Sequence, residues 1–149
     1  MSLKSTTLFP SGPTVPAIGV GLMSLGHAYG HAGDDATRLA YLDSLYSLGE
    51  TFWDNADLYG DAEDVCGKWF EANPDKRKDI FLSTKFGFVM EGHDFSKMTI
   101  RSDAEYVKEA IEKSLKRMKT EYVDLYYCHR HDGKTPIERT VKAMQELKE

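Results

Sequence analysis

The sequence predicts an α/β fold, because short apolar segments alternate with amphipathic segments along the chain. Four segments typical of buried strands are each followed by a segment with apolar residues at helical spacing. This alternation predicts parallel strands that are joined by right-handed helical crossovers. A β-hairpin is expected ahead of the first unit, within residues 5–18, because Pro10 to Pro13 forms a turn-rich insert there.

The first strand–helix unit begins with the apolar run at residues 18–23. Asp34 or Asp35 is expected to cap the helix that follows, and Gly49 is expected to end it. The apolar positions of this helix are spaced so that a single stripe faces the core. They are Leu39, Leu42, Leu45 and Leu48.

The second unit begins with the strand at residues 51–54, which ends at Asp54. Because side chains alternate along a strand, Trp53 should point to the opposite face from Asp54 and pack under a helix. A helix is expected from about residue 61 to residue 70. Its buried face should carry Ala62, Val65 and Trp69.

The third and fourth units have strands at residues 80–85 and 123–128, and a long loop without a clear period is expected from residue 87 to residue 101. Ser102 to Glu105 and Thr135 to Glu138 have the spacing of a capping box, so a helix is expected to begin at each. The buried positions are Val107, Ile111, Leu115 and Met118 in the first helix, and Val141, Met144 and Leu147 in the second.

The length of the chain favours half of a (β/α)8 TIM barrel. A closed barrel takes roughly 250 residues, whereas this chain has 149 residues. No linker or repeat divides it, so residues 1–149 are interpreted as one incomplete domain with a hairpin and about four strand–helix units. The helical pattern continues to Glu149 without a capping residue, and we therefore expect the chain to end before the fold does.

Composition and charge argue against several classes of protein. The net charge is −5 and no basic run is suited to following phosphates, which disfavours nucleic-acid binding. No apolar run reaches membrane-spanning length and no signal peptide is recognisable, so a cytoplasmic protein without membrane association is expected. The basic runs at residues 76–78 and 113–119 are interpreted as solvated faces, and Cys66 is interpreted as a packing residue.

Two motifs suggest other sites but are incomplete. Gly19 and Gly21 begin a pattern similar to a dinucleotide fingerprint, but Ser24 stands where the third glycine would be. No metal site is expected, because no second ligand pair with zinc spacing accompanies the one cluster of ligand types. That cluster contains Cys128, His129, His131 and Asp132.

Four polar side chains are predicted to meet at one end of the sheet. Asp54, Lys85 and His129 end three successive strands, and Tyr59 follows in the loop after Asp54. Ligands bind beyond the carboxyl ends of parallel strands, and neighbouring strands lie about 4.8 Å apart, so these groups can converge. Each residue alone is more simply interpreted as structural, but together they could protonate an oxygen on which negative charge develops. Reduction of a carbonyl by hydride addition creates such an oxygen.

The segments around these residues resemble the signature segments of the aldo-keto reductases. They are Gly19–Ser24, Asp54–Gly60, Ser83–Gly87 and Tyr122–Arg130, and the N-terminal hairpin is similar too. The resemblance implies a barrel fold, NADPH as hydride donor and reduction of an aldehyde or ketone to an alcohol.

The resemblance also implies roles for individual residues. Tyr59 would be the proton donor, and Lys85 would favour its ionised form. Asp54 would anchor Lys85, and His129 would orient the substrate carbonyl. Met23 and Asp54 would be nearly the only cofactor contacts in this part of the chain, because most contacts in the family come from strands five to eight.

A second function stays open beside catalysis. The chain could be a catalytically inactive, truncated half-barrel that acts as an interaction or assembly module. The edges of its first and fourth strands would then be exposed, and unpaired edges are templates for pairing. Such a chain should self-associate or pair with the missing C-terminal half.

Overall fold

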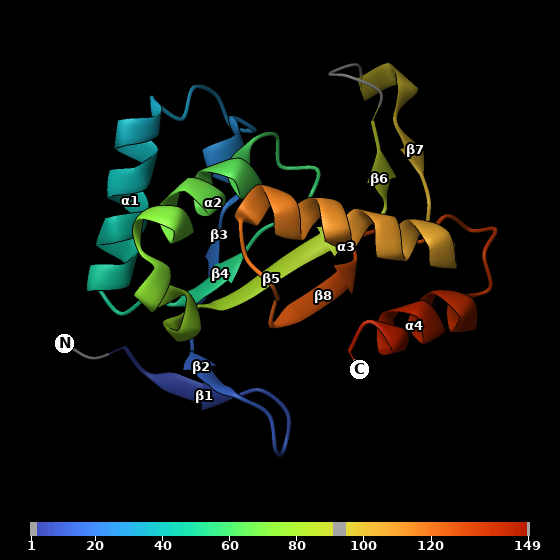
Figure 1. The fold of residues 1–149 in the computed structure, drawn as a ribbon, viewed down its shortest axis with the longest axis horizontal. Coiled ribbons are helices and arrows are strands. Elements are labelled where there is room, and N and C mark those ends of the chain that lie inside the picture. Colours follow the sequence, from blue (N-terminus) through green and yellow to red (C-terminus); the bar gives the residue numbers. More distant parts are fainter. Residues whose placement is uncertain (1–2, 91–94, 149) are drawn as a thin grey trace.

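The computed structural model describes residues 3–90 and 95–148 and contains one parallel sheet of four strands (Figure 1). Its strands, in spatial order, are β3 (Val20–Gly21), β4 (Phe52–Asp54), β5 (Phe81–Phe86) and β8 (Leu125–Cys128). The helices that follow them are α1 (Asp35–Ser47), α2 (Ala62–Ala72), α3 (Ala104–Met118) and α4 (Ile137–Glu146). The predicted alternation of parallel strands and helices is therefore confirmed.

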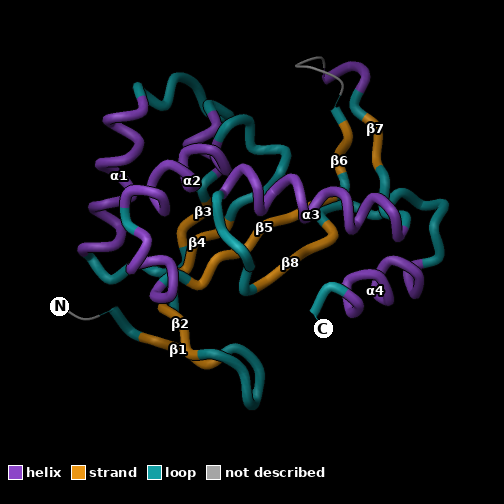
Figure 2. Tube along the Cα trace, viewed as in Figure 1, coloured by secondary structure: helices purple, strands orange, loops and turns teal. Residues whose placement is uncertain are grey.

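Two antiparallel ribbons lie at opposite ends of the sheet (Figure 1). Strands β1 (Ser5–Thr7) and β2 (Thr14–Pro16) form the predicted hairpin. Strands β6 (Phe88–Val89) and β7 (Thr99–Ile100) pair within the segment predicted to be an irregular loop. That prediction was wrong because strands of two residues are too short to produce a periodic pattern. The tube in Figure 2 also shows the short 3-10 helices η1 (Met23–Gly26), η2 (Pro74–Asp79) and η3 (Phe95–Lys97).

Helices α2 and α3 lie over one face of the sheet, and the main core forms between them and the strands (Figure 1). Trp53 is fully buried there, with its ring centroid 4.9 Å from that of Trp69 and 5.9 Å from that of Phe70. The prediction that Trp53 faces away from Asp54 is confirmed. Asp54, Ser83 and Lys85 therefore lie on the other face of the sheet.

Neither predicted capping box forms. Asp103 caps α3 in place of Ser102, because its carboxylate accepts a hydrogen bond from the Tyr106 N–H at 3.1 Å. The Ser102 hydroxyl instead accepts from the Asp132 N–H at 3.2 Å, and the Thr135 hydroxyl donates to Asp132 at 2.8 Å. Both hydroxyls therefore hold the loop between β8 and α4, and no side chain caps α4.

Two predicted apolar stripes are less buried than expected. Leu48 follows the last residue of α1 and is 68% exposed. On α4, Val141 is 46% exposed and Leu147 is 41% exposed, whereas Thr140 and Ala143 are buried. Because α4 packs mainly against α3, only one narrow side of α4 is covered.

Membrane spans, metal ligands and Cys66 were the subject of three further predictions, which concern the described part of the chain. No helix among the residues that the structure describes is long and apolar enough to cross a bilayer. The same residues contain no group of three His, Cys, Asp or Glu side chains that could hold a metal ion. Cys66 is fully buried, and burial raises the pKa of its thiol to about 12, so the predicted packing role is confirmed.

Candidate active site

The carboxyl ends of β4 and β5 bring Asp54, Lys85 and Tyr59 together. The parallel register places Ser83 beside Asp54, so Lys85, two residues further along β5, points to the same face. The Lys85 ammonium donates to Asp54 Oδ2 at 2.6 Å, to the Asn55 carbonyl at 2.8 Å and to Tyr59 Oη at 3.2 Å. An ammonium has three donors, and here each donor has a partner within one small cluster.

The orientation of the Asp54 carboxylate is set by Ser83, a residue that the sequence interpretation did not select. The buried Ser83 hydroxyl donates to Asp54 Oδ1 at 2.7 Å, which leaves Oδ2 directed at Lys85. Strand alternation could have identified this partner, because Ser83 and Lys85 are two residues apart on β5.

His129 lies against the ring of Tyr59. The backbone N–H of His129 donates to the Phe86 carbonyl at 2.7 Å, which fixes the chain just beyond the end of β8. Its ring makes edge contacts with Tyr59 and Phe88, at centroid distances of 5.8 Å and 5.1 Å. Burial, followed by the positive charge of Lys85, lowers the pKa of His129, so the imidazole is neutral at neutral pH. Its Nδ1 is buried and has no hydrogen-bond partner among the described residues.

The two predicted cofactor contacts lie at the open end of the sheet. Met23 begins η1, two residues after the end of β3, and its sulfur accepts a hydrogen bond from the Tyr29 hydroxyl at 3.6 Å. Gly21 lies beside Asp54 in the register, and a Cβ at Gly21 would have no neighbour within 4 Å. A side chain at Gly21 would therefore meet open space beside the Asp54 carboxylate.

The loop that carries Tyr59 packs closely against η1. A Cβ added at Gly26 would lie 1.7 Å from the carbonyl oxygen of Tyr59, so only glycine fits there. In this way η1 supports the position of the phenol from outside the sheet.

Gly26→Ala is therefore expected to lower the free energy of unfolding by about 1–3 kcal/mol, the usual cost of forcing an extra carbon into a packed position. Urea unfolding of wild type and variant measures the difference. Gly21→Ala is the matched control, because a methyl group at Gly21 meets open space. Equal losses in the two variants would show that the close approach at Gly26 is unimportant.

Both basic runs that were predicted to be solvated contain an arginine with buried contacts. Arg77 is 8% exposed, and its guanidinium donates to the carbonyls of Ile80 and Tyr122, both at 2.8 Å. The side chain of Arg117 is 28% exposed and contacts the buried Glu63. The interpretation of these runs as wholly solvated was wrong, because composition cannot show which member of a basic run turns inward.

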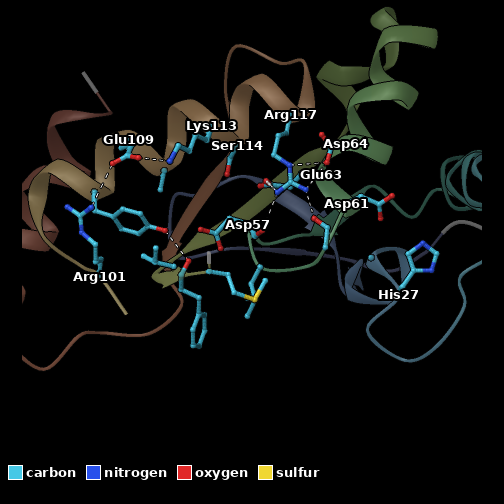
Figure 3. Close-up of a pocket in the computed structure, with 18 residues that line it drawn as sticks. His27, Asp57, Asp61, Glu63, Asp64, Arg101, Glu109, Lys113, Ser114 and Arg117 are labelled. Atoms are coloured by element: carbon cyan, nitrogen blue, oxygen red, sulfur yellow. Dashed lines mark hydrogen bonds and ion pairs between the residues drawn. The ribbon is translucent and has the colours of Figure 1, made fainter. Parts of the chain in front are cut away.

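A pocket of about 890 Å³ lies behind the loop of Tyr59, against α3 (Figure 3). Asp57, Glu63 and Arg117 line it. Tyr59, Lys85 and His129 do not contribute to the lining of this pocket.

Comparison with known proteins gives consistent similarities. The model of the Aldo/keto reductase family matches residues 17–149. Aldo-keto reductase str7 of Strobilurus tenacellus is 44% identical over 138 residues, which are 89% of this chain and 39% of that protein. Aldo-keto reductase yakc of Schizosaccharomyces pombe, whose name specifies NADP(+), is 40% identical over 138 residues, which are 91% of this chain and 40% of that protein.

A solved structure shows the same arrangement of elements. Aldo-keto reductase AKR11C1 from Bacillus halodurans, in its holo form, superposes with a TM-score of 0.84 at 34% sequence identity. The match covers 98% of this chain and 46% of that structure. This chain thus spans less than half the length of each of these three proteins.

Proposed function

Since this chain belongs to the aldo/keto reductase family, we propose that it forms the acid–base half of a cytoplasmic, NADPH-dependent enzyme that reduces an aldehyde or ketone to an alcohol. The observation that carries the proposal is the contact of the Lys85 ammonium with Tyr59 Oη at 3.2 Å and with Asp54 at 2.6 Å. A phenol, an ammonium and a carboxylate in this order suit proton donation to a developing oxyanion.

Tyr59 gives its hydroxyl proton to the carbonyl oxygen of the substrate. NADPH supplies the hydride when it is bound. As negative charge develops on the carbonyl oxygen, the phenol O–H bond breaks, an alcohol O–H bond forms, and a phenolate remains on Tyr59. The Lys85 ammonium stabilises that phenolate, and Asp54 holds the ammonium in place. Solvent then returns the proton to Tyr59.

His129 orients the substrate in this proposal. A neutral imidazole carries one N–H donor, and the lowered pKa of His129 keeps its ring neutral at neutral pH. The His129 ring contacts the ring of Tyr59. A hydrogen bond from His129 to the carbonyl oxygen of the substrate would therefore direct that oxygen towards the Tyr59 hydroxyl. Met23 and Asp54 are the proposed contacts to the nicotinamide end of the cofactor.

A second function, as an interaction module, is favoured by the open face of the sheet. Leu125 and Tyr127 lie beside Ser83 and Lys85 in the register and face away from the helices, and Tyr127 is 38% exposed. The sheet also ends at β3 and β8, whose outer edges are unpaired among the described residues.

We propose that four further strand–helix units cover the open face of the sheet, in a longer form of the protein or in a second copy of it. We call the resulting complex the assembled protein.

Titration with NADPH, followed by fluorescence and combined with a sizing column, separates the two functions. The enzyme proposal expects quenching by the assembled protein and oxidation of NADPH that depends on an added aldehyde. Self-association of the 149-residue chain without any NADPH binding would instead support the interaction module. Binding without turnover of any aldehyde or ketone would contradict the proposed reaction.

A further inference from the structure

Arg117, in the last turn of α3, holds the backbone on both sides of Tyr59. Its guanidinium donates to the Asp57 carbonyl at 3.2 Å and also to the Gly60 carbonyl. These two carbonyls flank Tyr59 in the loop between β4 and α2. We propose that Arg117 is a positioning residue, which keeps the Tyr59 hydroxyl within reach of Lys85. The inference rests on the proposed role of Tyr59 as proton donor.

Two carboxylates on α2 fix the guanidinium in this orientation (Figure 3). Arg117 contacts Glu63 at 3.1 Å and Asp64 at 2.7 Å. The Glu63 side chain has no exposed surface, whereas the Arg117 side chain is 28% exposed. Loss of Arg117 would therefore leave a buried carboxylate without its partner, which is costly. Arg117 contacts four partners at once, two carboxylates and two carbonyls. A guanidinium has five N–H donors in a fixed fork, whereas a lysine ammonium has three, so lysine cannot reproduce all four contacts.

The same network reaches the strand that carries Lys85. The Thr84 hydroxyl donates to Glu63 Oε1 at 2.7 Å, and Thr84 directly precedes Lys85 on β5. The Asp57 N–H donates to the Lys85 carbonyl at 3.1 Å. Arg117 is thus connected both to the loop of Tyr59 and to the strand of Lys85. A shift of the guanidinium would alter the separation of the phenol and the ammonium.

A purely structural role for Arg117 is the alternative, and Arg77 provides a matched control for it. Like Arg117, Arg77 donates to two backbone carbonyls and pairs with a carboxylate, here Asp124 at 3.1 Å. It lies at the amino end of β5, whereas the active-site candidates lie at the carboxyl end. Loss of Arg77 should therefore lower stability without moving Tyr59.

The first test compares the kinetics of Arg117→Met, Arg117→Lys and Arg77→Met in the assembled protein. Arg117→Met is expected to lower kcat by about 10- to 100-fold and to change KM by less than about threefold, because misplacement of the proton donor affects the chemical step. Arg117→Lys should recover only part of the loss, and it replaces Arg117→Met if that variant does not fold. Arg77→Met should lower the melting temperature and leave kcat per folded molecule unchanged.

The second test measures amide hydrogen exchange and needs no turnover. The Tyr59 N–H donates to the Ala56 carbonyl at 3.1 Å, and the Asp57 N–H donates to Lys85. Both amides should exchange at least about tenfold faster in the Arg117 variant than in wild type, because the loop opens locally more often. They should exchange at the wild-type rate in Arg77→Met.

Unchanged exchange in the Arg117 variant, or equal losses of kcat in the two arginine variants, would overturn the inference. The proposed role of Tyr59 fails in a different way. If Tyr59→Phe turns over the substrate at the wild-type rate, the phenol is not the proton donor. In that case the exchange rates still decide whether Arg117 holds the loop.

Discussion

Tyr59→Phe is expected to lower carbonyl reduction by about 100- to 10,000-fold, the range over which a positioned proton donor accelerates a reaction. Phenylalanine keeps the ring that lies 5.8 Å from His129, and the substitution removes only the hydroxyl that is 3.2 Å from the Lys85 ammonium. Binding of NADPH should be unchanged. Steady-state turnover and fluorescence titration of the assembled protein measure the two effects separately.

Tyr122→Phe serves as the control for loss of a phenol. Tyr122 is 45% exposed at the amino end of the sheet, where its ring stacks against Arg77. Its loss should leave both turnover and cofactor binding unchanged. If Tyr59→Phe keeps more than about a tenth of wild-type turnover, Tyr59 is not the principal proton donor.

The convergence of Asp54 and Lys85 could be predicted because it depends on the order of the strands, and Tyr59 could be placed near them because it follows Asp54 in the adjoining loop. In a parallel sheet every strand has its carboxyl end at the same edge, so residues at strand ends meet whatever the details of packing. The direction of Trp53 was predictable for a similar reason, since strand alternation is a local rule.

The partners that hold the site could not be predicted in this way. Ser102 and Thr135 have the spacing of capping residues, but their hydroxyls contact Asp132 instead, which lies 30 residues from Ser102 and three from Thr135. Arg117 lies 54 residues from Glu63 in the sequence, and the lysines of the same run (Lys113, Lys116 and Lys119) are exposed. Such contacts depend on how helices pack, and neither local spacing nor composition determines that.

Asp57, two residues before Tyr59, is expected to make the fold less stable as the pH rises from about 4 to about 7. Burial, followed by the nearby Glu63 carboxylate, raises the pKa of Asp57 from 3.8 to about 7. Its Oδ1 is buried and has no partner in the described part of the chain. In this window the folded protein keeps a proton that the unfolded chain has lost. The free energy of unfolding should therefore fall by up to about 1.4 kcal/mol per pH unit.

Urea unfolding between about pH 4 and pH 8 tests this expectation in wild type and in Asp57→Asn. The amide resembles the neutral carboxyl, so the variant should lose the slope that Asp57 contributes. It should be more stable than wild type at pH 8, by at most about 4 kcal/mol. Asp75→Asn, on the exposed surface of η2, controls for the loss of one negative charge. Parallel curves for wild type and Asp57→Asn would contradict the prediction.

The proton on Asp57 should also affect turnover, because Asp57 belongs to the loop that positions Tyr59. The backbone N–H of Asp57 donates to the Lys85 carbonyl, and the backbone carbonyl of Asp57 accepts from Arg117. A charge that appears on the side-chain carboxyl of Asp57 therefore acts close to both hydrogen bonds. His129 has a lowered pKa and is already neutral near pH 7. A change in kcat centred near pH 7 should therefore disappear in Asp57→Asn. If the change persists in that variant, a group other than Asp57 causes it, and the proposed link between Asp57 and turnover is wrong.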